Sequence, residues 1–230
     1  MKIVLFDIDG TLVWTHGAGR RAMQRALAAV VGAAGPHDHR YDGKTDKQIV
    51  REAMRSAGFG DHDVDLAMEQ VLARYLAELD VEFDGEGHGA KLLPGVAELL
   101  DVIETRDDVV LGLLTGNVAA GAERKLRAVG VDRARFVIGA FGSDHEERPE
   151  LSRIARDRAS AYVGAQVRGD ACVIIGDTPS DVACARPIGA RAIAVATGSF
   201  GLEALAACQP HAVFSDLSGT DAVLRAIVDA

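Results

Sequence analysis

Residues 2–12 read KIVLFDIDGTL, a short apolar run that leads directly into two aspartates, a glycine and a threonine. A run of this length rich in Val, Ile and Leu is typical of a strand buried on both faces of a sheet. Alternation along a strand puts residues i and i+2 on one face, so Asp7 and Asp9 are expected to point together at its carboxyl end. Open α/β sheets bind ligands at that edge. The stretch therefore predicts the first strand and a polar site at its end.

Other short apolar runs alternate with longer amphipathic ones. We predict five further strands, at Val109–Leu114, Phe136–Gly139, Ala171–Ile175, Arg191–Ala196 and Ala212–Phe214. Helices are predicted around them at Val96–Glu104, Ala119–Val129, Glu150–Val163 and Val182–Ile188. This β-α alternation predicts an α/β fold with a doubly wound, mostly parallel sheet.

The region between the first two predicted strands breaks the alternation. It contains three helical patterns, Ala18–Val31, Thr45–Ala57 and Val64–Leu79, and no convincing strand. Thr45 and Gln48 have the spacing of a capping box at the start of the second helix. We therefore predict a helical domain at 14–92, inserted into a core domain formed by 1–13 and 93–230.

Composition excludes several classes of protein. The 230 residues include 25 Lys and Arg against 34 Asp and Glu, a net charge of −9. A nucleic-acid binder needs clustered cations, so no nucleic-acid partner is expected. No apolar run approaches the ~18 residues that suggest a membrane helix, and the N-terminal run is too short for a signal peptide. Cys172, Cys184 and Cys208 match no disulfide or metal pattern and are expected to be small buried residues in a reducing cytoplasm.

A second motif, Thr115-Gly116-Asn117, closes the second predicted strand. It offers a hydroxyl, a backbone N–H that a ligand can approach closely, and an amide. Such groups hold phosphate oxygens at a helix N-terminus, where the helix dipole favours anions. The same triplet is also a common turn, so the motif alone leaves both interpretations open.

A third motif, Gly176-Asp177-Thr178-Pro179-Ser180-Asp181, follows another apolar strand. Asp177 is expected at the strand end, and Asp181 at the start of the next helix, where capping is the alternative role. With Asp7 and Asp9, Asp177 completes an oxygen-rich cluster suited to Mg²⁺, which prefers carboxylates, waters and phosphate oxygens.

Two basic residues are candidates for a cation beside these acids. Arg148 precedes Pro149 and a predicted helix, whereas Lys125 lies on the helix after Asn117. A fixed positive charge there could pair with a phosphoryl oxygen and with Asp7. Position relative to the motifs favours Arg148, and Lys125 is the rival.

Together the motifs resemble the haloacid dehalogenase-like (HAD) hydrolase superfamily, in its phosphoglycolate phosphatase-like group with a helical cap. The resemblance covers nearly the whole chain, with D-x-D-G-T-L at Asp7–Leu12, the Thr115 motif, a basic residue, and G-D-x-x-x-D at Gly176–Asp181. The helical insertion at 14–92 would be the cap. The Lys-Pro usual in the third motif is Arg148-Pro149 here, and Arg keeps the charge but not the geometry of an ammonium.

The resemblance implies roles for the acidic residues. Asp7 would be the nucleophile that forms an aspartyl-phosphate, and Asp9 would protonate the leaving alkoxide and then activate water. The carboxylates of Asp7 and Asp177 and the backbone carbonyl of Asp9 would hold Mg²⁺, with Asp181 steadying the metal site.

The resemblance also implies how the phosphoryl group is held. Thr115 and the Gly116 N–H would bind its oxygens, with Asn117 beside them, and Arg148 would balance their charge. Positive compensation is required, because two carboxylates and a dianionic phosphate otherwise repel one another.

Asp9 narrows the expected reaction, because dehalogenases and phosphonatases of this superfamily generally lack an acid there. The expectation is a Mg²⁺-dependent phosphatase of a small phosphate monoester, phosphoglycolate-like or a sugar phosphate, acting as a monomer or homodimer. A sugar-phosphate mutase keeps both aspartates and stays open. A receiver-like signalling module, which needs only about half this length, and a catalytically silent binding protein are alternatives of another class.

Substrate choice is expected to lie in the cap. Candidates are Trp14, His16 and Arg20 near its start and the loop Tyr41–Thr45, in which Lys44 is the basic residue. Arg20 or Lys44 could meet a substrate carboxylate. The alternatives are packing for Trp14, a solvated hinge for His16 and an exposed loop charge for Lys44.

Overall fold

Six parallel strands form one sheet in the order β5-β4-β1-β6-β7-β8 in a computed structural model that describes residues 1–85 and 87–229. The central strand is the one that carries the aspartate motif, and it pairs with β4 on one side and β6 on the other. The strands span Lys2–Phe6 (β1), Val109–Thr115 (β4), Ile138–Phe141 (β5), Cys172–Gly176 (β6), Arg191–Val195 (β7) and Ala212–Phe214 (β8).

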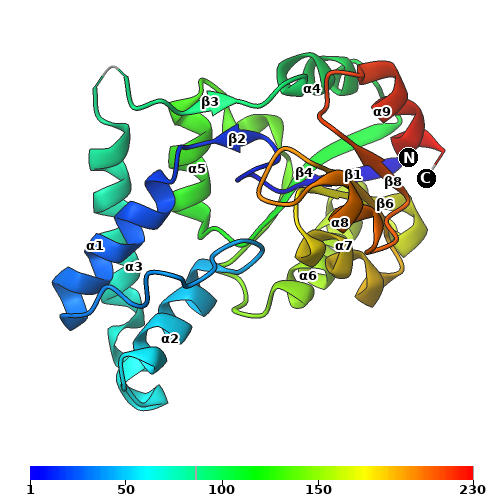
Figure 1. Cartoon of the computed structure of the whole chain (residues 1–230). Helices are drawn as coiled ribbons and strands as arrows, with labels where there is room; N and C mark the ends of the chain where they lie inside the picture. The colour runs from blue at the N-terminus through cyan, green and yellow to red at the C-terminus, as the bar shows by residue number, and fades with distance from the viewer. Residues whose placement is uncertain (86, 230) are drawn as a thin grey trace.

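Helices cover both faces of this sheet (Figure 1). Because side chains alternate along a strand, Val4 and Phe6 face one apolar cluster, whereas Ile3 and Leu5 face the other. The first face is covered by α4 (Val96–Glu104), α5 (Ala119–Ala128) and α9 (Thr220–Val228), and the second by α6 (Arg148–Val163), α7 (Pro179–Ala185) and α8 (Leu202–Ala206). The predicted doubly wound α/β fold is confirmed, and its strand pairs are all parallel.

Three helices, which we call the cap helices, lie to one side of the sheet in Figure 1. They are α1 (Ala18–Val31), α2 (Asp46–Ser56) and α3 (Asp61–Phe83). They bury a separate apolar cluster, which the core residue Val118 joins. The chain enters and leaves this region through a short antiparallel pair, β2 (Val13–Trp14) and β3 (Lys91–Leu92). The limits 14 and 92 remain our proposed bounds of the insertion.

The structure corrects several predicted elements. β5 begins at Ile138 rather than Phe136, because a 3₁₀ turn at Arg133–Arg135 precedes it and pairing with β4 starts only at Ile138. The pair β2–β3 was not predicted, since two residues carry no periodic pattern. The helices α8 and α9 were not predicted either, and α3 extends beyond the predicted Val64–Leu79 at both ends.

The start of α7 is a further correction. The helix begins at Pro179 rather than Val182, and Asp181 is its third residue rather than its first. Thr178 caps it: its hydroxyl accepts from the Asp181 N–H, and the Asp181 carboxylate accepts from the Thr178 N–H, at 3.3 and 3.0 Å. These reciprocal bonds form a capping box, which satisfies amide groups that the helix itself cannot pair.

The predicted capping box at Thr45 is half present. Thr45 accepts from the Gln48 N–H at 3.1 Å, but the Gln48 side chain donates to Glu52 instead of returning to the cap. Cys172 and Cys184 are buried as predicted, whereas Cys208 is only half-buried, because α8 ends at Ala206 and leaves it in the following turn. Within residues 1–85 and 87–229, no helix combines the length and apolarity needed to cross a bilayer.

Candidate active site

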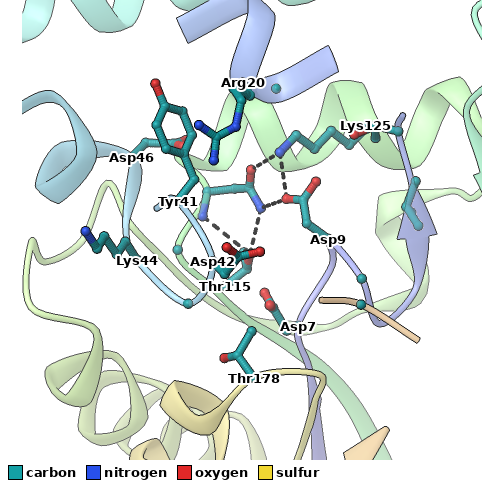
Figure 2. A pocket seen from close by; sticks show the side chains of 18 of the residues that line it. Asp7, Asp9, Arg20, Tyr41, Asp42, Lys44, Asp46, Thr115, Lys125 and Thr178 are labelled. Carbon is teal, nitrogen blue, oxygen red and sulfur yellow. Dashed lines mark hydrogen bonds and ion pairs between the residues drawn. The ribbon is translucent and has the colours of Figure 1, made fainter. Parts of the chain in front are cut away.

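A cleft of about 410 Å³ lies where the carboxyl ends of β1, β4 and β6 meet the cap helices. Parallel strands bring their carboxyl ends to one edge, so motifs far apart in the sequence meet there. Figure 2 shows Asp7 and Asp9 reaching into this space, with Arg20, Tyr41 and Asp46 on its other side. From the core, its lining includes Asp7, Asp9, Thr115, Gly116, Asn117, Lys125, Arg148 and Asp177.

Asp7 lies at the floor of the cleft. Its N–H donates to the Ile175 carbonyl at 2.9 Å, which extends the β1–β6 ladder by one residue and fixes the backbone. The side chain is buried, and Arg148 Nη2 lies 3.1 Å from its Oδ2. Burial raises the pKa of Asp7 to about 6, although the charge of Arg148 opposes that rise.

Arg148, the first residue of α6, holds two carboxylates at once. The same Nη2 that contacts Asp7 also pairs with Asp181 Oδ1. The guanidinium is 5% exposed, and its Nε has no hydrogen-bond partner within the described part of the chain. Asp181 Oδ2 in turn accepts from the Thr178 hydroxyl at 2.7 Å. We call Asp7, Arg148, Asp177, Thr178 and Asp181 the Arg148 cluster.

Three carboxylates of this cluster could share an ion. Oxygen atoms of Asp7, Asp177 and Asp181 lie within 4.8 Å of one another, and all three residues are buried. Both oxygens of Asp181 already have protein partners, whereas Asp177 has Thr11 Oγ1 at 3.1 Å from Oδ1. Burial, with the charges of Asp181 and Asp7, raises the pKa of Asp177 well above its usual range. Crowded buried carboxylates with oxygen-only donors fit a hard divalent cation.

Glycine backbones close around Asp177. Gly10, which has φ +77°, and Gly198 both lie so near that a Cβ on either would collide with the Asp177 carboxylate. Gly10 also lets the chain turn sharply after Asp9, as the positive φ requires a residue without a side chain. The sequence thus permits an acidic group to sit between two loops with little space around it.

Asp9 faces a different set of partners. Its Oδ2 accepts from Asn117 Nδ2 at 2.8 Å and from Lys125 Nζ at 2.6 Å. Lys125, which approaches Asp9 in Figure 2, also donates to Asn117 Oδ1 at 2.5 Å, and Asn117 Nδ2 donates to Thr115 Oγ1 at 2.8 Å. The two rival cations therefore both line the cleft, and they serve different aspartates: Arg148 contacts Asp7, and Lys125 contacts Asp9.

The cap residues are placed unequally. The Arg20 guanidinium stacks over the Tyr41 ring at 4.2 Å and donates to the His39 carbonyl at 2.8 Å. Lys44 lines the cleft, but its ammonium pairs with Glu52 and points away from Asp7 and Asp9 in Figure 2. Its backbone carbonyl packs so tightly on Gly116 that a Cβ there would collide with it. Trp14 and His16 also line the cleft.

Among the residues of the cleft that sequence reasoning missed are two buried ionisable ones from the cap helices, Asp46 and Tyr75. Asp46 is buried at the start of α2. Its Oδ2 accepts at 2.8 Å from the N–H of Val118, the residue that directly precedes core helix α5. Burial raises the pKa of Asp46 to about 6, although the charge of Lys125 opposes it. Tyr75 of α3 is buried in the same wall. Their only sequence signals were an acid at a helix start and an aromatic on a helix face, which are ordinary features.

Comparison with known proteins gives a consistent result. A family model described as haloacid dehalogenase-like hydrolase matches residues 1–189. A phosphoglycolate phosphatase of Rhodospirillum rubrum is 28% identical over 94% of this chain and 88% of that protein. A phosphoglycolate phosphatase of Synechococcus elongatus is 29% identical over 91% of each. The crystal structure of a hydrolase from Pseudomonas syringae superposes with a TM-score of 0.73, at 22% identity and 99% coverage of both chains.

Proposed function

The chain belongs to the haloacid dehalogenase-like hydrolases, and on that premise we propose that it is a Mg²⁺-dependent phosphatase of small phosphate monoesters. The observation that carries the proposal is the floor of the cleft, where Asp7 lies 3.1 Å from Arg148 and shares a buried acidic cluster with Asp177. The names of the two curated relatives support the same reaction.

In the proposed reaction Asp7 attacks phosphorus. An oxygen of Asp7 forms a bond to phosphorus as the bond from phosphorus to the leaving alkoxide breaks, which gives an aspartyl-phosphate. A carboxylate nucleophile divides a very slow hydrolysis into two easier displacements. Arg148, which lines the cleft beside Asp7, balances the charge that gathers on the phosphoryl oxygens.

Asp9 transfers the protons. It gives a proton to the leaving alkoxide in the first step, then takes one from the water that displaces Asp7 in the second. General acid–base groups of this kind contribute about 10²–10⁴ in rate. Thr115 and the Gly116 N–H are proposed to bind the phosphoryl oxygens, and the buried hydroxyl of Thr115 beside Asn117 supports that assignment.

The carboxylates of Asp7 and Asp177 and the carbonyl of Asp9 would hold Mg²⁺, with Asp181 acting through Arg148. When bound, the ion supplies the positive charge that lets a dianionic phosphate approach these carboxylates. The raised pKa values of Asp7 and Asp177 support this fit, because they reflect buried negative charge that Arg148 offsets only in part.

The substrate is proposed to be small and to carry a second polar group. A cleft of about 410 Å³ lined by Arg20 suits a phosphoglycolate-like acid, whose carboxylate Arg20 could meet, or a sugar phosphate. The Lys44 ammonium is a weaker candidate, because Glu52 already neutralises it.

The test is phosphate release from a panel of phosphate monoesters, with and without Mg²⁺. We expect release that needs the ion, that EDTA removes, and that an Asp7→Asn variant lacks. No release above that variant from any monoester would overturn the proposal. Interconversion of phosphosugars with little free phosphate would instead identify a mutase of the same fold.

A further inference from the structure

Lys125 is a buried charge that the proposed reaction does not use. Its side chain is 4% exposed, on core helix α5. One ammonium makes two short contacts, to Asp9 Oδ2 at 2.6 Å and to Asn117 Oδ1 at 2.5 Å. Asn117 donates to the same Oδ2. Asp9, Asn117 and Lys125 therefore form a closed triangle, in which every pair is in contact.

Each of the three cap helices has a residue beside the Lys125 ammonium. A Cβ on Gly19 of α1 would lie 3.2 Å from Lys125 Nζ, so α1 packs against the ammonium, and the Tyr75 hydroxyl of α3 is hydrogen-bonded to Lys125. Asp46 of α2 faces the same charge. Burial works against the charged form, but Asp9, Tyr75 and Asp46 hold the pKa of Lys125 above its usual value. The ammonium is therefore fixed from both sides of the cleft.

We propose that Lys125 is a positioning residue for Asp9, and that the cap helices set its place. Asn117 and Lys125 both donate to Asp9 Oδ2. The other oxygen, Oδ1, is therefore the one that gives a proton to the leaving group and then takes one from the water. The inference rests on the proposed phosphatase reaction. It assigns Lys125 to the two proton transfers only, since the attack by Asp7 depends on Arg148.

The proton transfers distinguish Lys125 from a structural residue. An alkyl leaving group needs the proton of Asp9 as its bond to phosphorus breaks. Nitrophenolate is a stable anion and leaves without one. Hydrolysis of the aspartyl-phosphate needs Asp9 again, as base, whatever the substrate was. A misplaced Asp9 therefore slows both steps for an alkyl phosphate but only the second step for 4-nitrophenyl phosphate.

The experiment compares wild type with Lys125→Met by rapid mixing in Mg²⁺. With 4-nitrophenyl phosphate we expect the initial burst of nitrophenolate to stay within about threefold, while steady-state turnover falls about 10²-fold, the range for a misplaced acid–base group. With the best alkyl phosphate of the panel, single-turnover release of the alcohol should fall by the same factor. A burst slowed as much as turnover, or no change in either, would overturn the inference.

Matched variants separate this outcome from general damage. Arg124 lies beside Lys125 on α5 and pairs with Asp80 of α3 at 2.8 Å, outside the cleft, so Arg124→Met removes an ionic α5–α3 contact without reaching Asp9. It should leave the burst and the turnover unchanged. Tyr75→Phe removes one hydroxyl on the cap side and should show the Lys125→Met pattern at about three- to tenfold, which keeps the inference testable if Lys125→Met fails to fold. A Tyr75→Phe enzyme with wild-type turnover would contradict the role of the cap helices.

Failure of the proposed function looks different. If wild type releases neither phosphate nor a nitrophenolate burst, the phosphatase assignment is wrong. If wild type shows both and Lys125→Met slows every step alike, the phosphatase assignment stands and only the role of Lys125 is lost.

Discussion

Two buried cations flank the aspartate motif, and they belong to different parts of the molecule. Arg148 and Lys125 are almost equally buried, at 5% and 4% exposure, and each contacts one of the two aspartates. The partners of Arg148 are Asp7, directly after β1, and Asp181, near the start of α7, both within the core. Lys125 instead lies between core groups and the cap helices. The core alone fixes Asp7, the proposed nucleophile, whereas Asp9, the proposed acid–base group, is fixed jointly by both regions.

Residue chemistry fits this division. The guanidinium of Arg is planar and always charged, and in Arg148 one of its nitrogens, Nη2, contacts both Asp7 and Asp181. The ammonium of Lys is a compact charge with three donors on a flexible stem, which suits a group that must meet partners from several helices. The comparison teaches that burial and charge alone do not identify which aspartate each cation contacts.

The largest effect on stability is expected from breaking the Arg148 cluster. Arg148→Met should destabilise the protein by about 3–5 kcal/mol in Mg²⁺-free buffer, because it leaves Asp7 and Asp181 buried without their partner. Urea unfolding measures the loss. Arg156→Met, on the same helix but paired with the exposed Asp157, should change stability by less than about 0.5 kcal/mol. Equal losses in the two variants would show that the cluster holds the core no better than a surface pair.

The second prediction concerns pH on the cap side. The pKa of Asp46 is raised from 3.8 to about 6, so the folded state binds more protons than the unfolded state between those values. Stability from protonated Asp46 is therefore full below about pH 4 and is lost as pH rises through about 6. Asp46→Asn avoids this loss and should exceed wild-type stability by up to about 3 kcal/mol at pH 8.

Urea unfolding at pH 4 and pH 8 tests this sign. Asn can still accept from the Val118 N–H, so the hydrogen bond between α2 and α5 is retained at both pH values. The advantage of Asp46→Asn should be near zero at pH 4. An advantage that is larger at pH 4 than at pH 8 would show that burial of the charged carboxylate does not limit stability.

The sequence was sufficient to predict the residues that the core contributes to the cleft. Asp7, Thr115 and Asp177 each follow a short apolar strand, and parallel strands end at one edge whatever the details of packing. Arg148 was reachable because Pro149 marks the start of its helix. The boundary of β5 was not, because Phe136 and Val137 are apolar and yet precede the first paired residue.

The cap side could not be predicted in the same way. The bond between Asp46 and Val118 joins residues 72 positions apart, and it depends on how α2 sits against α5. Lys125 was a candidate only as a rival for the place of Arg148, since no spacing rule says that one helix carries the partner of Asp9. No sequence signal distinguished Tyr75 from the other buried residues of α3.

A third, smaller effect on stability and rate is expected at two residues that cap helix N-termini, Thr178 in the core and Thr45 in the insertion. Thr178→Ala and Thr45→Ala each remove a capping hydroxyl and should each cost about 1 kcal/mol of stability in urea unfolding. Only Thr178 holds Asp181, the partner of Arg148. We therefore expect Thr178→Ala alone to slow the nitrophenolate burst, by a few-fold. A slower burst in Thr45→Ala would mean that the cap helices also act on Asp7, the proposed nucleophile.

The smallest effect comes from one methyl group beside Lys125. Gly19→Ala places a Cβ 3.2 Å from Nζ, so the ammonium must move by a few tenths of an ångström. Turnover should fall a few-fold, while stability rises by about 0.5 kcal/mol, since Ala favours a helix over Gly. Gly121→Ala gives the helix benefit where the new Cβ would meet Val118 and two leucines of α3. It should leave turnover unchanged, and a matching fall there would remove the case for Lys125.

The pairing of β2 with β3 suggests that the helices inserted between these strands can be replaced by protein engineering. Val13 lies opposite Leu92, and Trp14 opposite Lys91. Opposed residues of antiparallel strands have Cα atoms only about 4.5–5.5 Å apart, a gap that a two-residue hairpin can join. We expect the three helices to be exchangeable for a foreign lid, or for a plain turn, without breaking the continuity of the sheet. The Arg148 cluster would keep its own sequence, whereas a new lid would have to supply the groups that Asp46 and Tyr75 now present to Lys125.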